Sequence, residues 1–524
     1  MKKALLLFTI SLFVFSTQAQ VQDLSALSTG TNVSFTTIYD NDEKLYGYLA
    51  LFYKGKATEN TRNFEYVILD TNLNRVANKD FEAENTVMGY YAYINFKDEL
   101  VMVPRVDYDD YNIFNYRKIK YPVRRIIDLS TNEIKAQDSL CYDENDGFYE
   151  CPENKELREM QREMLKQRKE SDDKTIYNSD VYELESGDFL LYETRYHFTI
   201  VGMVHTYYYY AFKKFDKDHN LVWEYEYRRP ENTPRRTKQT AEVFHLSDNY
   251  LYLLEKKSVK RDDTHQLLKI DLTNGAVTQK MVIDEILPSS IKSLQGMYSL
   301  RRHIQNKKTY NDKIYFIARD YDKKGKHIGF IRLTIDETNN TITFDKFPWT
   351  ALEKYIKINR YGAVEKGYEL YIRDAFMMED GKVGMLFEKF KFSNNMLTGN
   401  VIPKATDMIF ITTDASFKVN NAMVLKKDKS RKNTSDYMYS QYLNDNKDVV
   451  FFYRNYQKDE ETKEKNWNLF INTVLNGNYH QEVIPISSEE NVIYPYIAKE
   501  GYILLREYNK DSKYNQIRLE RLNF

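Results

Sequence analysis

Cys141 and Cys151 are the two cysteines of this 524-residue chain, and their chemistry can be inferred from their spacing. They close a short loop, and no histidine stands close enough in sequence to complete a two-cysteine metal site. In a chain that leaves the reducing cytoplasm, two such cysteines favour a disulfide. We therefore expect a disulfide between Cys141 and Cys151, with two inert or metal-binding thiols as the alternative.

The loop between the cysteines is also rich in the oxygen ligands that Ca²⁺ prefers. These are Asp143, Glu144, Asn145, Asp146 and Glu150. Gly147 stands one position early for an EF-hand-like loop, and the segment 216–220, with oxygens at alternate positions, lacks the required glycine. We expect solvated turns, no metal site and no cofactor, with calcium as the alternative.

Two histidines and a run of tyrosines are further candidates. His197 and His205 flank a predicted turn at Val201–Gly202, so they could lie opposite each other and share a metal or a proton. We expect them to be ordinary strand histidines, since no carboxylate pattern completes a site. The run Thr206–Tyr210 could stack on sugars, although alternate tyrosines of one strand face opposite sides of a sheet.

No local motif for catalysis occurs in the sequence. A Ser nucleophile elbow, a His-Glu-x-x-His zinc motif, a glycine-rich phosphate loop and a Cys–His pair are all absent. The catalytic residues are therefore unknown from the sequence. A site assembled from Asp, Glu, Arg and Tyr side chains of several strands would leave no local pattern, so an enzyme is disfavoured but not excluded.

The elements that must position any such site are strands, because one strand-like motif recurs along the chain. It is an apolar, aromatic run that ends in a charge, as in Tyr502–Tyr508, Ile314–Tyr321 and Val449–Tyr456. The charges, which we call the motif charges, are Lys54, Arg105, Glu193, Glu255, Arg319, Glu388, Arg454 and Arg506. A turn rich in Asp, Asn and Gly follows the first seven copies and leads to a returning strand. Another strand precedes most copies.

Each repeat thus holds about four antiparallel strands, and stacking such units around an axis gives a β-propeller. The sequence predicts an all-β fold, a β-propeller of four-stranded antiparallel blades, with eight blades and seven as the alternative. The last repeat lacks a returning strand, which we expect a segment between Gln20 and Phe35 to supply. The mixture of Arg and Glu among the motif charges suggests that an Arg on one blade pairs with a Glu on the next.

One insertion interrupts the repeats. We expect a helix near 153–170, within an insert of about 152–172, because four apolar residues lie at helical spacing among charged ones. These residues are Leu157, Met160, Met164 and Leu165. The stripe would pack on its own domain, and the alternative is that it docks a partner helix.

The N-terminus predicts export. Two lysines precede the apolar run Ala4–Phe15, and small residues lead to Ala19, which is the pattern of a signal peptide. We expect residues 1–19 to be cleaved off between Ala19 and Gln20, and residues 20–524 to form a single β-propeller domain in the periplasm or outside the cell. The apolar run is too short to span a bilayer as a helix, and no transmembrane segment is expected in the mature chain.

In repeat layout the chain resembles exported bacterial β-propeller proteins, from about residue 31 to its end. The resemblance implies an architecture and supplies no catalytic residues, because the Trp-Asp, kelch Gly-Gly, Tyr-Trp-Thr-Asp and Asp-box signatures are absent. With 76 basic and 77 acidic residues, the chain offers no electrostatic case for nucleic acid. We expect a non-catalytic binding or scaffold protein of the cell envelope with a protein or glycan partner. The alternative is a carbohydrate-active enzyme, a hydrolase or lyase, with carboxylates and tyrosines at the propeller axis.

Overall fold

The computed structural model describes residues 20–523 with gaps. The gaps are 41–43, 86, 96, 107–123, 138–139, 144–146, 151–174, 185, 200–203, 230–236, 260–261, 284–303, 311–312, 323, 379–380, 395–400, 429–434, 445–446, 459–464, 487–490 and 510–514. The predicted signal peptide, the whole helical insert and Cys151 therefore lie outside the described residues. Among the described residues, no helix is long and apolar enough to cross a membrane.

The chain divides into two compact units. Unit 1 comprises Met1–Gln137 and Tyr437–Phe524. Its described strands are β1 (Gln20–Asp23), β2 (Thr31–Tyr39), β3 (Leu45–Lys56), β4 (Thr61–Asp70), β5 (Arg75–Glu84), β6 (Val87–Ile94), β7 (Glu99–Val106), β8 (Arg124–Asp128), β9 (Glu133–Gln137), β28 (Tyr437–Leu443), β29 (Asp448–Lys458), β30 (Lys465–Leu475), β31 (Asn478–Pro485), β32 (Asn491–Ile497), β33 (Tyr502–Asn509) and β34 (Asn515–Arg521). A short 3-10 helix, η1 (Leu24–Ala26), follows β1.

Unit 2 comprises Asp138–Asp436. Its described strands are β10 (Leu140–Asp143), β11 (Gly147–Glu150), β12 (Thr175–Glu183), β13 (Phe189–Thr199), β14 (Val204–Phe215), β15 (Leu221–Arg228), β16 (Thr237–Leu246), β17 (Tyr250–Val259), β18 (Asp262–Asp271), β19 (Val277–Val282), β20 (Ile304–Tyr310), β21 (Lys313–Tyr321), β22 (His327–Asp336), β23 (Thr341–Pro348), β24 (Glu369–Met377), β25 (Val383–Asn394), β26 (Val401–Thr413) and β27 (Val419–Leu425). The 3-10 helices η3 (Trp349–Leu352) and η4 (Glu365–Gly367) lie between β23 and β24.

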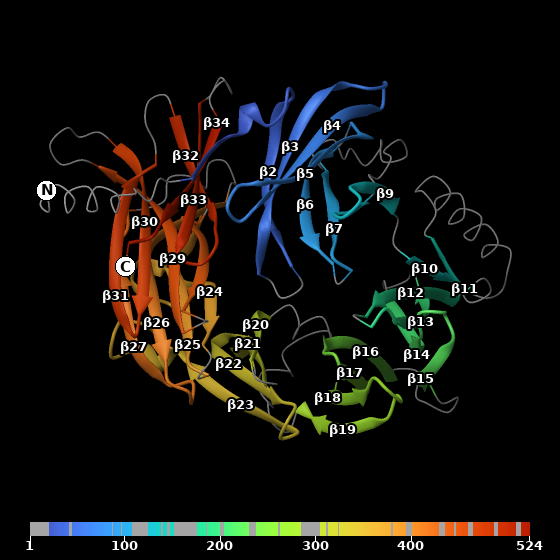
Figure 1. Cartoon of the computed structure of the whole chain (residues 1–524). Helices are drawn as coiled ribbons and strands as arrows, with labels where there is room; N and C mark the ends of the chain where they lie inside the picture. The colour runs from blue at the N-terminus through green and yellow to red at the C-terminus, as the bar shows by residue number, and fades with distance from the viewer. Residues whose placement is uncertain are drawn as a thin grey trace, which may run out of the picture. The chain divides into compact units, whose positions relative to one another are not determined.

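These strands form four-stranded antiparallel meanders (Figure 1). Six are separate sheets, and an eight-stranded sheet consists of two more, β2–β5 and β6–β9, joined where Ile38 and Tyr39 pair in parallel with Ala92 and Tyr93. The hairpin of β10 and β11 is a two-stranded sheet of its own. The described residues thus hold eight four-stranded units. The predicted all-β fold of four-stranded antiparallel propeller blades is confirmed, and the eight units agree with the expected count of eight blades.

Each motif forms the second strand of its meander. The eight strands are β3, β7, β13, β17, β21, β25, β29 and β33. A second strand has a hydrogen-bonded neighbour on either side, and in a blade that lies between two others of its unit both faces are covered as well, so its sequence is continuously apolar instead of alternating. In β17, for example, Leu251, Leu253 and Leu254 are all buried. The recurring run is therefore the core of each blade.

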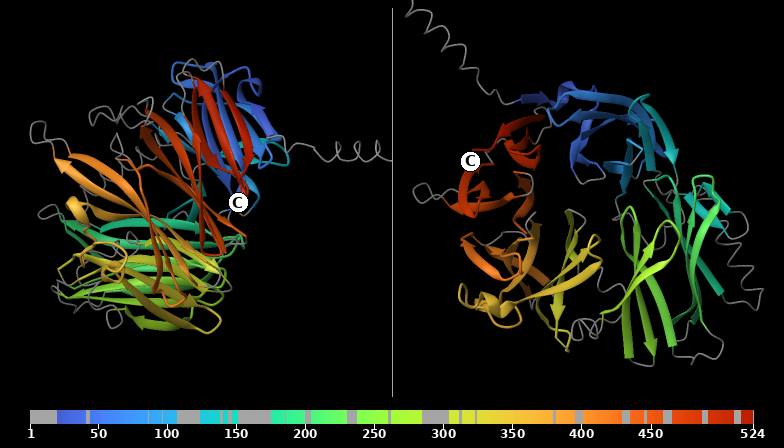
Figure 2. Two further views of the ribbon diagram at one scale, coloured as in Figure 1. Left: turned by 90° about the vertical axis from the view of Figure 1, so that its left-hand side faces the viewer. Right: turned by 60° about the horizontal axis from the view of Figure 1, so that its bottom comes forward.

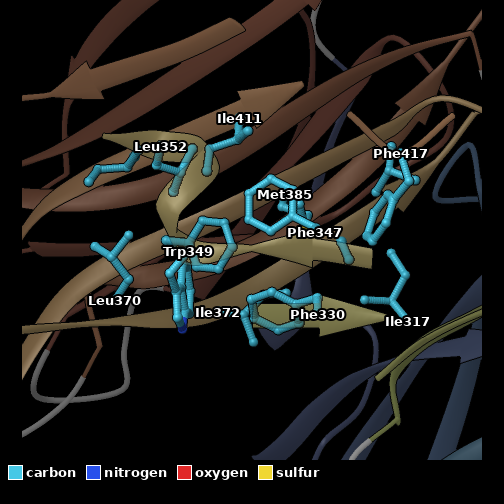
Figure 3. Close-up of a cluster of buried hydrophobic side chains, with 14 of the residues drawn as sticks. Ile317, Phe330, Phe347, Trp349, Leu352, Leu370, Ile372, Met385, Ile411 and Phe417 are labelled. Atoms are coloured by element: carbon cyan, nitrogen blue, oxygen red, sulfur yellow. The ribbon is translucent and has the colours of Figure 1, made fainter. Parts of the chain in front are cut away.

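Successive meanders pack face to face within each unit. In unit 2, a shared core joins β12–β15 to β16–β19, a second joins β16–β19 to β20–β23, and a third joins β20–β23 to β24–β27. The third core is built around Trp349, which Figure 3 shows beside Phe330, Phe347 and Ile372. In unit 1, shared cores join β28–β31 to the sheet of β32–β34, that sheet to β2–β5, and β2–β5 to β6–β9. Each unit is thus a run of four blades, which Figure 2 displays from two further sides.

The last sheet is completed by the N-terminal strand. β1 pairs antiparallel with β34, with Gln20 opposite Leu519 and Asp23 opposite Gln516. Leu24, which follows β1, is fully buried in the core shared by this sheet and β2–β5. The expectation that a segment after Gln20 supplies the missing strand is confirmed.

Candidate ligand-binding site

The acidic motif charges lie inside the blades and are held by neighbouring side chains. Glu193 is 2 % exposed, accepts a hydrogen bond from the Tyr209 hydroxyl at 3.3 Å and lies 3.1 Å from Lys213 Nζ. Both partners stand on β14, the neighbouring strand of the same sheet. A buried carboxylate needs such partners, so Glu193 has a structural role.

Glu255 is held by two tyrosines of the preceding blade. Its Oε1 accepts hydrogen bonds from Tyr210 at 2.5 Å and Tyr225 at 2.7 Å, and Gln266 donates to its Oε2. Burial, and after it the contact with Glu255, raises the pKa of both tyrosines above the usual range. Both phenols therefore stay protonated as donors. Two tyrosine hydroxyls thus meet one carboxylate, the residue types that the enzyme alternative requires, but Glu255 is only 3 % exposed.

Glu388 anchors a buried network of charges. Arg373 donates to Glu388 Oε2 through Nε at 2.7 Å, and its Nη2 lies 2.7 Å from the same oxygen. Lys427 Nζ lies 3.3 Å from Glu388 Oε1 and 2.5 Å from Asp436 Oδ2. Since Glu388 and the Lys427 side chain are fully buried, breaking one pair would leave an uncompensated charge out of contact with water.

The expected pairing of an Arg on one blade with a Glu on the next is wrong for Glu255, Arg319 and Glu388. The described partners of Glu255 are Tyr and Gln side chains, and those of Glu388 are Arg373, Lys427 and the segment 435–436. Arg319 contacts a tyrosine instead. The physical reason is burial. Each buried carboxylate needs hydrogen-bond or charged partners inside the core, and side chains packed directly against it supply them, so it does not pair with the motif arginine of the next blade.

The basic motif charge Arg319 lies over an exposed aromatic ring. Its Cζ is 5.4 Å from the ring centroid of Tyr371, which stands on β24, the first strand of the next sheet. Arg373 lies 4.8 Å from the same ring. Tyr371 is 44 % exposed, so the tyrosine is braced by two guanidinium groups and still reaches solvent.

Two phenylalanines of β25 continue this face of the sheet. Phe390 lies 5.7 Å from Tyr371, and Phe392 meets Phe390 edge-to-face at 5.0 Å. Phe392 is 68 % exposed, the highest value among the exposed large hydrophobic side chains described. We call the group of Arg319, Tyr371, Arg373, Phe390 and Phe392 the Tyr371 surface.

The two arginines of the Tyr371 surface differ in their partners. Arg373 is neutralised by Glu388. The Arg319 side chain makes no hydrogen bond or ion pair with any described residue, and its Nε is a buried atom without an acceptor. Within the described part of the chain the ring of Tyr371 is the one partner of this side chain. Arg319 is only partly buried, so an acceptor from outside would meet its terminal Nη groups and not the buried Nε.

Related Arg–aromatic contacts occur in unit 1. Arg105 Cζ lies 4.9 Å from the ring of Tyr91, which is 58 % exposed on β6. Arg506 lies 5.2 Å from Tyr508, but its Nη2 donates to Asn32 at 2.8 Å and its Nε to Asn515 at 2.9 Å. The basic motif charges thus recur as cation–π partners.

The remaining sequence candidates fall into ordinary structural roles. His197 pairs with Thr206 and His205 with Phe198, so the two histidines do not stand opposite each other in the register. Tyr209 and Tyr210 are buried, so these two rings cannot stack on a sugar from solvent. Asp216 accepts the N–H groups of Asp218 and Asn220 and so closes its own turn.

The cysteine loop is only partly described. Cys141 lies on β10 opposite Tyr149 of β11, while Cys151 lies outside the described residues, so the disulfide stays a prediction. No group of three or more potential metal ligands occurs among the residues that the structure describes.

Sequence reasoning located Arg319 as a motif charge and missed Tyr371. The tyrosine lies on a first strand, some fifty residues after Arg319 in the chain, and no local pattern links the two. The available signal was the alternation of Glu369, Tyr371 and Arg373 with the buried Leu370 and Ile372 on β24, which places polar and aromatic groups together on one face.

No protein family model matches the chain, and no curated protein matches it. The β-propeller domain of the Trilobed protease from Pyrococcus furiosus is 10 % identical with a TM-score of 0.31, over 87 % of this chain and 96 % of that one. A polysaccharide lyase described as an ulvan lyase is 8 % identical with a TM-score of 0.30, over 94 % of each chain. For an acylaminoacyl peptidase from Pyrococcus horikoshii the identity is 10 % and the TM-score 0.27, over 53 % of this chain, which spans 38 % of the peptidase. At these identities and TM-scores, the likeness carries no argument about what the chain binds.

Proposed function

We propose that this chain is an exported, non-catalytic binding protein of the cell envelope and that the Tyr371 surface contacts its partner. The observation that carries the proposal is the presence of two exposed aromatic rings, Tyr371 and Phe392, beside a guanidinium without a protein acceptor. Aromatic and arginine side chains are the residue types that dominate binding hot spots. The acidic motif charges support the non-catalytic part, since Glu193, Glu255 and Glu388 are each buried against partners of their own unit.

Retention of the mature chain on immobilised polysaccharides tests the proposal. Residues 20–524 are passed over columns of neutral, carboxylated and sulfated polysaccharide, beside a variant carrying Tyr371→Ala and Phe392→Ala. The matched control carries Leu221→Ala and Val222→Ala, which remove two exposed apolar side chains from β15 of the same unit. We expect at least one column to retain the wild type and the control but not the Tyr371 variant. Equal retention of both variants, or of no protein, would contradict the assignment.

The second candidate function is a carbohydrate-active enzyme, and the contact of Glu255 with Tyr210 and Tyr225 is the observation that favours it. Release of reducing ends or of unsaturated sugars from the same polysaccharides would reveal this activity. A hydrolase or lyase that uses this group would lose its activity in Glu255→Gln and keep it in Glu369→Gln. Glu369 is exposed on β24 and takes no part in the group around Glu255.

A further inference from the structure

We infer that the Tyr371 surface takes an acidic oligosaccharide, a chain of sugars that carries carboxylate or sulfate groups. The inference rests on the proposed binding function and names its ligand class. It starts from Arg319, whose guanidinium is positioned by Tyr371 at 5.4 Å and has no acceptor among the described residues. A planar guanidinium offers parallel N–H donors that match a carboxylate or sulfate group. The cation therefore selects an anionic group.

The position of Arg319 on its strand explains why this cation stays available. Tyr315 and Ile317 precede it on the same face of β21 and are buried in the core shared with β24–β27. Arg319 is the next residue on that face and is only partly buried. The strand thus carries the guanidinium out of an apolar core to the edge of the sheet, where an apolar environment on one side strengthens its attraction for an anion.

The other members of the surface provide what a sugar needs besides a charge. No described residue accepts or donates a hydrogen bond at the Tyr371 hydroxyl, which can therefore bond a sugar hydroxyl. Phe392, at the far end, is an exposed apolar ring on which the C–H face of a sugar can lie. A simple inorganic anion would use Arg319 alone and would not account for the two exposed rings.

The size of the surface points to more than one sugar unit. Arg319, Tyr371, Phe390 and Phe392 are joined by three successive contacts of 5.4, 5.7 and 5.0 Å. We infer that a ligand following this row of side chains, from the guanidinium to Phe392, is longer than one sugar ring. Glu369 stands opposite Phe390 in the register and would repel an anion there, so the acidic group of the ligand lies at the Arg319 end.

Titration calorimetry with defined probes tests this inference on the mature chain. The probes are an oligogalacturonate, a low-mass dextran sulfate, neutral dextran oligosaccharides and poly-glutamate. We expect the carboxylated or the sulfated sugar to bind, the neutral sugar to bind at least tenfold more weakly, and the binding to weaken at 0.5 M salt, since salt screens an exposed ion pair. The two acidic probes tell a carboxylate from a sulfate as the recognised group.

Two arginine variants distinguish binding at a specific site from non-specific attraction of the acidic sugar to positive charge. Arg319→Gln should weaken binding of the acidic sugar by about 10- to 100-fold, the range of a hydrogen bond to a charged group. The control is Arg228→Gln, which removes an arginine that also lies over a tyrosine but is paired with Glu226; it should bind as the wild type does. Thermal melting of both variants checks that each is folded.

The outcomes distinguish this inference from the proposed function. If neutral dextran binds as tightly as the acidic sugars, or if Arg319→Gln binds like Arg228→Gln, the inference of an acidic ligand is wrong. The proposed binding function would still hold in that case. If poly-glutamate binds more tightly than any sugar, the ligand is an acidic peptide and the inference of a saccharide is wrong. If no probe binds and the polysaccharide columns also retain nothing, the proposed function fails together with the inference.

Discussion

Carboxylates at the residue scale serve two structural purposes in this chain. Turn aspartates such as Asp70, Asp216 and Asp414 accept the N–H groups two and four residues later. The motif glutamates are instead buried against cations or hydroxyl groups. In the turn 216–220, one of the two segments that a sequence reader could assign to calcium, an oxygen of Asp216 is thus used by the chain itself, which is why acid-rich turns are weak evidence for a metal.

The turn at Asp128 predicts a pH dependence of stability. The Ser130 hydroxyl, and then the N–H groups of Ser130 and Thr131, lower the pKa of Asp128 to about 2, against about 3.9 in an unfolded chain. Because the folded pKa is the lower one, the stabilisation is complete above about pH 4 and is lost as the pH falls toward 2. Asp128→Asn should therefore lower the melting temperature at pH 7 and match the wild type near pH 2.

The control for Asp128 is Asp218→Asn, in a turn where the aspartate two residues earlier accepts the N–H groups. This variant should melt like the wild type over the whole pH range. A difference between wild type and Asp128→Asn that stays constant from pH 7 to pH 2 would show that the charge of the turn aspartate has no effect.

From the network around Glu388 we predict that Glu388→Gln, a substitution of nearly equal size, lowers the unfolding free energy by a large amount. Glu388→Gln removes the charge that compensates Arg373 and Lys427, of which Lys427 keeps Asp436. Removing one partner of a buried pair costs about 3–5 kcal/mol, and we expect the lower end. Glu369→Gln, exposed on the neighbouring strand, should change the unfolding free energy by less than about 0.5 kcal/mol. Urea unfolding of both variants checks this, and equal midpoints would contradict it.

At the scale of the element, the strands were predictable and the Tyr371 surface was not. The second strands can be recognised in the sequence because burial on both faces requires a continuous apolar run, as in Leu251–Leu254. The aspartate turns mark where the third strand ends. The first strand β24 instead alternates exposed with buried residues, and Tyr371 belongs to no motif that recurs along the chain. The surface joins β21, β24 and β25 of two sheets, and such a juxtaposition depends on packing between blades rather than on local sequence.

The N-terminal strand β1 predicts a defect that is confined to one sheet. A chain that starts at Leu24 instead of Gln20 leaves the outer edge of β34 without its partner. The lost hydrogen bonds, at about 0.5–1.5 kcal/mol each, should lower the melting temperature. An unpaired edge also invites pairing between molecules, so dimers should form, as light scattering can measure. Val21→Ala, which removes only an exposed side chain, should behave like the wild type. A truncated chain that stays monomeric and melts normally would show that β1 is dispensable.

At the scale of the whole molecule, the two units are built from the chain in different ways. Unit 2 is one continuous segment, Asp138–Asp436, whereas unit 1 joins Met1–Gln137 to Tyr437–Phe524. The sheet of β32–β34 needs β1 from the opposite end of the chain. Bringing distant segments together costs loop entropy before any contact forms, so the sheet that holds both ends should form last.

The order of folding follows from this difference in connectivity. In refolding from urea with pulsed hydrogen exchange, amides of β25 and β26, which pair within one segment of unit 2, should become protected before those of β1 and β34. Contacts far apart in sequence slow folding, so the delay should persist at any urea concentration that permits folding. Simultaneous protection of both strand pairs would mean that the chain ends meet early. In that case β1 would act as a nucleus for unit 1, and its removal would slow the folding of that unit instead of only exposing an edge.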